Sequence, residues 1–172
     1  DDGLMAGAFG MGPGSFPRIW LARGPLDNQP ATYGFVTDHG NTWLRMGAGE
    51  TLYYAQRVPA EAGMDYRLSL KVRSDAEKVR MDTPLCEKQM LNSRRCVWFG
   101  FDVPGDGQWH SINHSFSSGE VGGRGFFDHL PTEFVLRHAG RGGVIEVDDV
   151  QLLDETGRNL LCNGDFSHGA DC

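Results

Sequence analysis

The chain has 172 residues, of which 40% are hydrophobic and 23% charged, so it suits one globular domain with a sizeable core. Its net charge of −7 argues against binding to a nucleic-acid backbone, which normally requires a surplus of basic residues. No run approaches the roughly 18 consecutive apolar residues of a membrane helix, so this segment is not expected to insert into a membrane.

Short alternating and apolar runs, separated by turns with glycine or proline, predict an all-β chain with little helix. The most regular run is Met64–Arg73, whose apolar and polar side chains alternate as in a strand with one solvated face. The segment Cys86–Arg95 is predicted to be either helical or a loop held by its cysteines. In chain order, the predicted strands are Ile19–Ala22, Thr32–Thr37, Thr42–Met46, Thr51–Val58, Met64–Arg73, Cys96–Val103, Trp109–Phe116, Glu133–His138 and Gly143–Leu153.

So many short strands with frequent turns predict a two-sheet antiparallel β-sandwich. No linker rich in glycine, serine or proline divides the chain, which indicates a single domain over residues 1–160. Residues 161–172 form a tail that repeats the start of the chain. Leu161–Gly169 aligns without gaps on Leu4–Gly12, at an offset of 157, with Leu, Gly, Phe and Gly in common.

The chain contains four cysteines in two pairs, and the members of each pair are ten residues apart. Their spacing is not C-x-x-C and no histidine pair completes a zinc pattern, which argues against a metal site. We favour the disulfides Cys86–Cys96 and Cys162–Cys172, because each would close a local loop; four buried thiols are the alternative. If the bridges form, the protein works outside the reducing cytosol, in a periplasm or outside the cell.

Five segments, taken in order, resemble the jelly-roll carbohydrate-binding modules attached to xylanases and laminarinases, which are similar to galactose-binding domains. The resemblance covers nearly the whole chain and implies a jelly-roll β-sandwich that binds a polysaccharide. The segments are Gly7-Ala8-Phe9-Gly10 followed by Trp20, Tyr53–Val58, Gly63–Ser74, Gly107–Phe116, and Ile145–Leu152 with its Val-Asp-Asp-Val sequence.

The same resemblance gives the tail two interpretations. Either Leu161–Phe166 is the first turn of a second module, or the tail folds back onto the first and is held by Cys162–Cys172. Asn159–Gly169 also resembles a pattern in extracytoplasmic parts of bacterial membrane proteins of the O-antigen polymerase and ligase type. Both resemblances suit a periplasmic or extracellular part of a larger protein.

The candidate ligand-binding residues are those that alternation places on outward strand faces, because the resemblance implies that the outward face of one sheet holds the glycan. An exposed ring can stack on a sugar, and Arg or Lys can bind hydroxyls or carboxylates, so the basic cluster would suit an anionic glycan. The alternative is a solvated face, with the tryptophan covered by a loop. The candidates are Tyr53, Arg57, Arg67, Lys71, Arg73 and Trp98, with Arg80 as a further basic neighbour.

Asp148 is predicted to point inward with Val150 and Leu152, where an unpaired carboxylate would be costly. The resemblance implies a structural Ca²⁺ held by this Asp and by a Glu of the N-terminal turn, but Gly10 replaces that Glu here. The alternative is a carboxylate that accepts hydrogen bonds. No cofactor is otherwise expected.

The acidic residues of the predicted strand Gly143–Leu153 do not form the two facing carboxyls of a glycosidase. No G-x-S-x-G sequence, which would indicate a serine nucleophile, is present. His114 is predicted to be a buried, satisfied imidazole rather than a base. We therefore expect a non-catalytic module. A structural domain of a polysaccharide-handling protein is the alternative, and a lyase or hydrolase, with Tyr53, Arg57 and Arg67 as a lyase set, is a third hypothesis.

Overall fold

The computed structural model describes residues 21–23, 33–47, 53–89, 92–123, 130–139 and 142–169. These residues form strands and no helix, so the described chain has no helix that could cross a membrane. The predicted N-terminal turn, Trp20 and the repeat partner Leu4–Gly12 lie outside the described residues. The strands are β1 (Leu21–Arg23), β2 (Tyr33–Asp38), β3 (Asn41–Gly47), β4 (Tyr53–Val58), β5 (Asp65–Arg73), β6 (Val79–Asp82), β7 (Leu85–Gln89), β8 (Asn92–Val97), β9 (Gly100–Val103), β10 (His110–Ser117), β11 (Thr132–His138) and β12 (Val144–Leu153).

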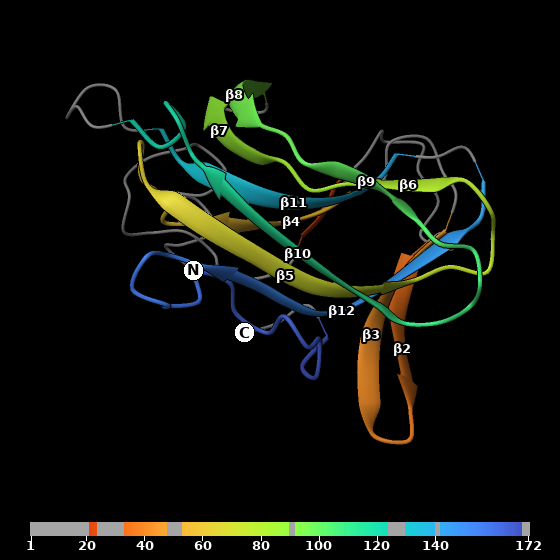
Figure 1. The fold of residues 1–172 in the computed structure, drawn as a ribbon. Coiled ribbons are helices and arrows are strands. Elements are labelled where there is room, and N and C mark those ends of the chain that lie inside the picture. Colours follow the sequence, from red (N-terminus) through yellow and green to blue (C-terminus); the bar gives the residue numbers. More distant parts are fainter. Residues whose placement is uncertain are drawn as a thin grey trace.

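The strands form two antiparallel sheets that pack face to face (Figure 1). The five-stranded sheet has the order β10-β5-β12-β3-β2, and its β2–β3 hairpin extends beyond the other strands. The seven-stranded sheet has the order β1-β4-β11-β6-β9, with β7 paired to β11 and β8 paired to β7. This arrangement confirms the predicted all-β jelly-roll sandwich.

The core lies between the two sheets and follows the alternation of the sequence. In β5, buried and solvated residues alternate along the strand, as predicted, and Leu68 and Val72 are fully buried. β11 is buried on both faces, and its Phe134 and Leu136 meet the core side chains of the other sheet. Burial of these apolar side chains is the main term that stabilises the sandwich.

A break at Thr83–Pro84 divides one long hairpin into two ladders. β6 and β7 lie end to end along the same edge of β11. On their other side, β6 pairs with β9 and β7 pairs with β8. Pro84 has no N–H to donate, but its carbonyl accepts the amide of Val135 at 3.0 Å, so the interruption of the ladder is short. On the opposite strand the break falls at Trp98 and Phe99, between β8 and β9.

Two predictions for this region are therefore wrong. Cys96–Val103 is not one strand, although Trp98 does face outward and Val103 is buried. Cys86–Arg95 is neither a helix nor a loop, because most of it belongs to the β7–β8 hairpin. Its predicted disulfide is confirmed, since Cys86 pairs with Cys96 across the hairpin and the two sulfur atoms are bonded.

The described part of the tail packs into the same core as the strands. Leu160, Leu161 and Phe166 are buried, and Phe166 is fully enclosed. The amide of Val150 donates to the carbonyl of Gly164, which places the tail against β12. Cys162 is disulfide-bonded, and its predicted partner, Cys172, lies outside the described residues. The described tail thus packs against the sandwich.

Replacement of Phe166 tests this packing. We expect Phe166→Ala to lower the free energy of unfolding by about 3–5 kcal/mol, because it removes a fully buried ring and leaves a cavity. Urea unfolding measures the change, and Ser167→Ala, at an exposed neighbour, is the matched control. A loss below about 0.5 kcal/mol for Phe166→Ala would show that the tail does not belong to the cooperative core.

Candidate functional site

The predicted ligand-binding residues do not form one surface. Arg67, Lys71 and Arg73 lie on β5, in the five-stranded sheet, whereas Trp98 follows β8 and Arg57 lies on β4, in the seven-stranded sheet. The outer faces of two packed sheets point in opposite directions, so the predicted groove with Trp98 beside the β5 cations does not exist. Tyr53 begins β4, and its side chain is outside the described residues.

Two of the three β5 cations are neutralised within the five-stranded sheet. The ammonium of Lys71 is 2.6 Å from Asp149, and this hydrogen bond raises the pKa of Lys71 above its ordinary value. The guanidinium of Arg73 donates from Nε to Glu146, at 2.6 Å, and lies over the ring of Trp109 at 4.6 Å. These contacts hold both side chains in place. Because each is paired with a carboxylate, each attracts an anionic ligand less strongly.

The third β5 cation, Arg67, lines an open groove of about 580 Å³ at the end of the five-stranded sheet. Its other lining residues are acidic, small or glycine, apart from the rings of Tyr66 and Phe116. No cluster of three or more His, Cys, Asp or Glu side chains in the described residues, here or elsewhere, could hold a metal ion. The acidic residues of the groove are Asp65, Asp154 and Glu155.

The prediction that Arg57 lies on a solvated face is wrong. Arg57 is 4% exposed, and its Nε lies 3.4 Å from a carboxylate oxygen of Glu133, which is itself buried. The Nζ of Lys88 approaches the other oxygen of Glu133 at 3.6 Å. Alternation identified the outer face of β4 correctly but could not show that this face is covered. Arg80, by contrast, is exposed and pairs with Asp82.

Among the described residues, Trp98 is the one large hydrophobic side chain that is exposed, at 57%. It stands at a groove of about 270 Å³ on the outer face of the seven-stranded sheet. Apolar groups form most of this groove, and Arg137 lies 5.8 Å from the centre of the Trp98 ring. The residues around the groove are Pro84, Cys86, Lys88, Ser93, Trp98, Val135 and Arg137.

Contacts of the next residue, Phe99, hold the chain at the break between β8 and β9, where Trp98 lies. The amide of Thr83 donates to the carbonyl of Phe99 at 2.7 Å, and the ring of Phe99 stacks on His114 at 3.7 Å. His114 is half-buried rather than buried as predicted, and it is packed as a ring between aromatic neighbours. The tryptophan can point to solvent because its neighbour Phe99 is anchored.

The groove at Trp98 is basic although the protein is acidic. Its lining contains two cations, Lys88 and Arg137, and no carboxylate, against a net charge of −7 for the chain. Lys88 is nearly buried and is paired with Glu133, whereas the side chain of Arg137 is 31% exposed and its contact with Asp82 is 3.8 Å long. Arg137 is therefore the cation that a ligand in the groove can reach.

Sequence reasoning missed Arg137 and Lys88. Alternation within Glu133–His138 places Arg137 on the same face as Val135, so that part of the pattern was available. The predicted Cys86–Cys96 bridge would also have aligned the two halves of a hairpin and placed Lys88 near Trp98. Neither signal shows which sheet the hairpin joins, because that depends on its pairing with β11.

Asp148 is only 4% exposed, but the prediction that it points inward with Val150 and Leu152 is wrong. A bulge separates it from Val150, and it lies opposite Lys71 instead. Its oxygens accept hydrogen bonds from Asn41 Nδ2, at 2.9 Å, and from the amide of Asp149, at 2.8 Å. Burial raises the pKa of Asp148, and these two donors oppose that rise only in part.

These described surroundings of Asp148 do not fit Ca²⁺. The groups directed at its oxygens are N–H donors, and the nearby ammonium of Lys71 supplies positive charge to Asp149. Calcium needs about 6–8 oxygen ligands, which these groups do not provide. The predicted calcium site would need the N-terminal turn, which lies outside the described residues, so it stays a prediction.

Solved carbohydrate-binding modules share this fold. A family 4 module has 15% sequence identity with the chain and a TM-score of 0.53, over 81% of this chain and 97% of that one. The CBM22-1 xylan-binding domain of Paenibacillus barcinonensis Xyn10C has 11% identity and a TM-score of 0.54, over 83% and 86% of the two chains.

A third match is longer than this chain. The CBM22-1 and GH10 modules of the Clostridium thermocellum endo-1,4-β-D-xylanase 10B, solved with xylohexaose, have 12% identity and a TM-score of 0.59, over 83% of this chain and 27% of that one. No protein-family model and no curated protein matches the sequence. At these identities the likeness concerns the fold, and at that level it confirms the resemblance found in the sequence motifs.

The buried carboxyl of Asp148 predicts a pH dependence. Its pKa is higher in the folded than in the unfolded protein, so the folded state binds this proton more tightly and loses stability relative to the unfolded state as pH rises. We expect the stability of the wild type, relative to Asp148→Asn, to fall from about pH 4 upward until the raised folded pKa is passed. Urea unfolding at a series of pH values measures the difference.

Asp154→Asn is the matched control with the opposite sign. Hydrogen bonds from Thr156 lower the pKa of Asp154, so this carboxylate stabilises the fold above its unfolded pKa and loses that effect as pH falls through its folded value. The stability of the wild type relative to Asp154→Asn should therefore increase as pH rises through the folded and unfolded pKa values of Asp154. If the stability difference from the wild type changed with pH in the same direction for both variants, the opposite pKa shifts assigned to Asp148 and Asp154 would be wrong.

Proposed function

We propose that this protein is a non-catalytic carbohydrate-binding module and that its ligand, a polysaccharide, binds in the groove beside Trp98. The observation that carries the proposal is the exposure of Trp98 at the edge of a groove in a fold shared with such modules. Large aromatic side chains are normally covered in a folded protein, and one held in water beside a groove indicates a binding surface.

The chemistry of the groove suits a sugar. The ring of Trp98 offers a flat apolar surface to the C–H face of a pyranose, and Val135 and Pro84 extend the apolar surface. Ser93 and Arg137 supply polar groups that can bind hydroxyls at its margin. Aromatic and Arg side chains are also the residues that contribute most at binding surfaces.

The charge of the groove favours a polysaccharide with anionic groups. Arg137 is partly exposed beside Trp98, and the residues that line the groove include no acid. A guanidinium binds a carboxylate with two parallel hydrogen bonds, which a neutral sugar cannot accept in the same way. We infer that an acidic sugar stacks on Trp98 with its charged group toward Arg137.

The same features support a site of action outside the reducing cytosol, as one part of a larger protein. The Cys86–Cys96 disulfide lies at the groove itself, and disulfides persist in oxidising compartments. The xylanase structure that shares the fold joins its module to a GH10 module. An analogous arrangement, with a module that holds polysaccharide for another domain, is the role we infer here.

Trp98→Ala is the direct test of the site. We expect it to weaken polysaccharide binding about tenfold, because a stacked ring contributes roughly 1–1.5 kcal/mol, and to leave the unfolding free energy nearly unchanged, because the ring is exposed. A glycan array first identifies the ligand, and calorimetry then compares the wild type with Trp98→Ala and with Trp98→Tyr, which keeps a ring.

Arg67→Ala is the matched control for the position of the site, because Arg67 is exposed on the opposite sheet. It should bind as the wild type does. Loss of binding in Arg67→Ala but not in Trp98→Ala would move the site to the five-stranded sheet. If the wild type binds no glycan on the array, the result would contradict our proposal and favour the alternative, a structural domain without affinity for glycans.

Arg137→Ala tests the charge of the ligand. We expect about tenfold weaker binding of an acidic polysaccharide and little change for a neutral one, because only the former loses a charge-assisted hydrogen bond. Binding of the acidic ligand to the wild type should weaken as salt is added, and less so for the variant. Equal losses for neutral and acidic ligands would contradict an anionic ligand.

A further inference from the structure

The strand that leads to Trp98 has few partners. In the described chain, β8 pairs only with β7, while β7 pairs on its other side with β11 through Leu85, Cys86 and Glu87. An edge strand held along one side frays more readily than a strand held along both. The position of Trp98 therefore depends on how firmly β8 is fixed to β7.

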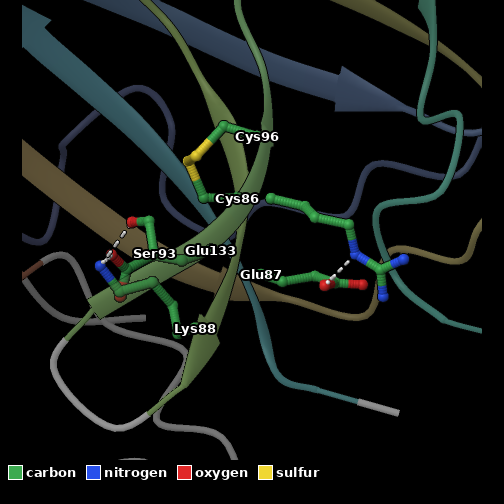
Figure 2. Close-up of a disulfide and its surroundings, with 7 residues drawn as sticks. Cys86, Glu87, Lys88, Ser93, Cys96 and Glu133 are labelled. Atoms are coloured by element: carbon green, nitrogen blue, oxygen red, sulfur yellow. Dashed lines mark hydrogen bonds and ion pairs between the residues drawn. A yellow bond between two sulfur atoms is a disulfide. The ribbon is translucent and has the colours of Figure 1, made fainter. Parts of the chain in front are cut away.

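The Cys86–Cys96 disulfide fixes this edge strand close to the proposed site. Cys96 is opposite Cys86 in the ladder and precedes Trp98 by two residues. Figure 2 shows the bridge between Cys86 and Cys96. Cys86 itself lines the groove, so the bridge joins the lining of the groove to the strand that leads to Trp98. A covalent bond here limits the motion of Trp98 more directly than a bridge elsewhere in the sandwich would.

Side-chain contacts hold β7 in the sandwich and link β8 to it. Glu87 is fully buried and accepts the amide of Gly122, and Lys88 is paired with Glu133 of β11. From β8, Arg95 pairs with Glu87 at 2.7 Å and with Glu120 at 3.4 Å, and the hydroxyl of Ser93 is 3.2 Å from Lys88. Figure 2 shows Lys88, Ser93 and Glu133 gathered on one side of the hairpin and Glu87 on the other.

We propose that the Cys86–Cys96 disulfide positions Trp98 for binding, so that the affinity of the groove for its ligand depends on the oxidation of this bond. The inference rests on the proposed function of the groove. Reduction by a dithiol supplies two electrons and two protons, breaks the S–S bond to give two thiols, and converts the reductant to a cyclic disulfide. β8 then keeps its ladder and its side-chain contacts but loses its covalent link to β7, so the ring of Trp98 must be ordered again when the ligand binds.

The sandwich itself does not depend on this bond. Leu85 is in the core, β7 stays paired with β11, and Phe99 stays anchored by Thr83 on the far side of Trp98. Reduction should therefore loosen β8 and Trp98 without unfolding the two sheets. Cys86 and Cys96 are thus positioning residues, which act on the ligand through Trp98.

The test uses the oxidised protein, the protein reduced with dithiothreitol, and the variant Cys86→Ser/Cys96→Ser, each titrated by calorimetry with a polysaccharide that the oxidised wild type binds. We expect about tenfold weaker binding after reduction and in the variant, and full recovery when the reduced wild type is reoxidised. Cys162→Ser/Cys172→Ser is the matched control, because it lacks the other two cysteines and should bind as the wild type does when oxidised and lose affinity when reduced.

Hydrogen exchange separates positioning from general loss of stability. We expect amides of β8 and of Trp98 to exchange faster in the reduced protein, while amides of β5 and β12 keep their protection. Unchanged affinity in the reduced protein would overturn the inference and leave the proposed function intact. Faster exchange throughout the sandwich would overturn it as well, since the bond would then stabilise the fold as a whole. If the oxidised protein binds no polysaccharide, the proposed function fails first.

Discussion

The functional face of this sandwich depends on the contacts that anchor Phe99 beside Trp98. One long hairpin next to β11 is interrupted at Thr83–Pro84 on one strand and at Trp98–Phe99 on the other, with β7–β8 at one end and β6–β9 at the other. Within the interruption, the amide of Thr83 still donates to the carbonyl of Phe99, at 2.7 Å. Because Phe99 is anchored by Thr83 and His114, the side chain of Trp98 is left to face solvent.

The two outer faces of the sandwich differ in how their charges are used. On the five-stranded sheet, Lys71 and Arg73 are held by Asp149 and Glu146, so much of the basic pattern of β5 is cancelled within the sheet. On the seven-stranded sheet, the partly exposed Arg137 lies beside an aromatic ring, and its contact with Asp82 is long, at 3.8 Å. The number of cations on a strand thus says less about binding than the number that remain without a close carboxylate.

The sequence predicted those parts of the fold that local periodicity determines. Alternation in β5 identified the strand and its buried side, and the spacing of Cys86 and Cys96 predicted their bond. It failed where partners are distant in the chain: Arg57 lies on an outer face as predicted but is buried with Glu133, which is 76 residues away. The bulge at Asp148 also reverses the inward and outward sides within one strand, which no periodic pattern can show.

A shared fold does not by itself assign a ligand, because β-sandwiches carry many functions, so the proposal rests on the side chains of the groove. Next to Lys88, which lines that groove, the buried Glu133 also contacts Arg57, and its single negative charge offsets part of the positive charge of the two. Such buried charges contribute little net stability, because desolvation opposes their attraction. Their effect is instead to fix Lys88 of β7 against β11 and to leave Arg137 as the reachable cation. The polar contacts that a ligand can gain are therefore concentrated beside the ring of Trp98, where a sugar would stack.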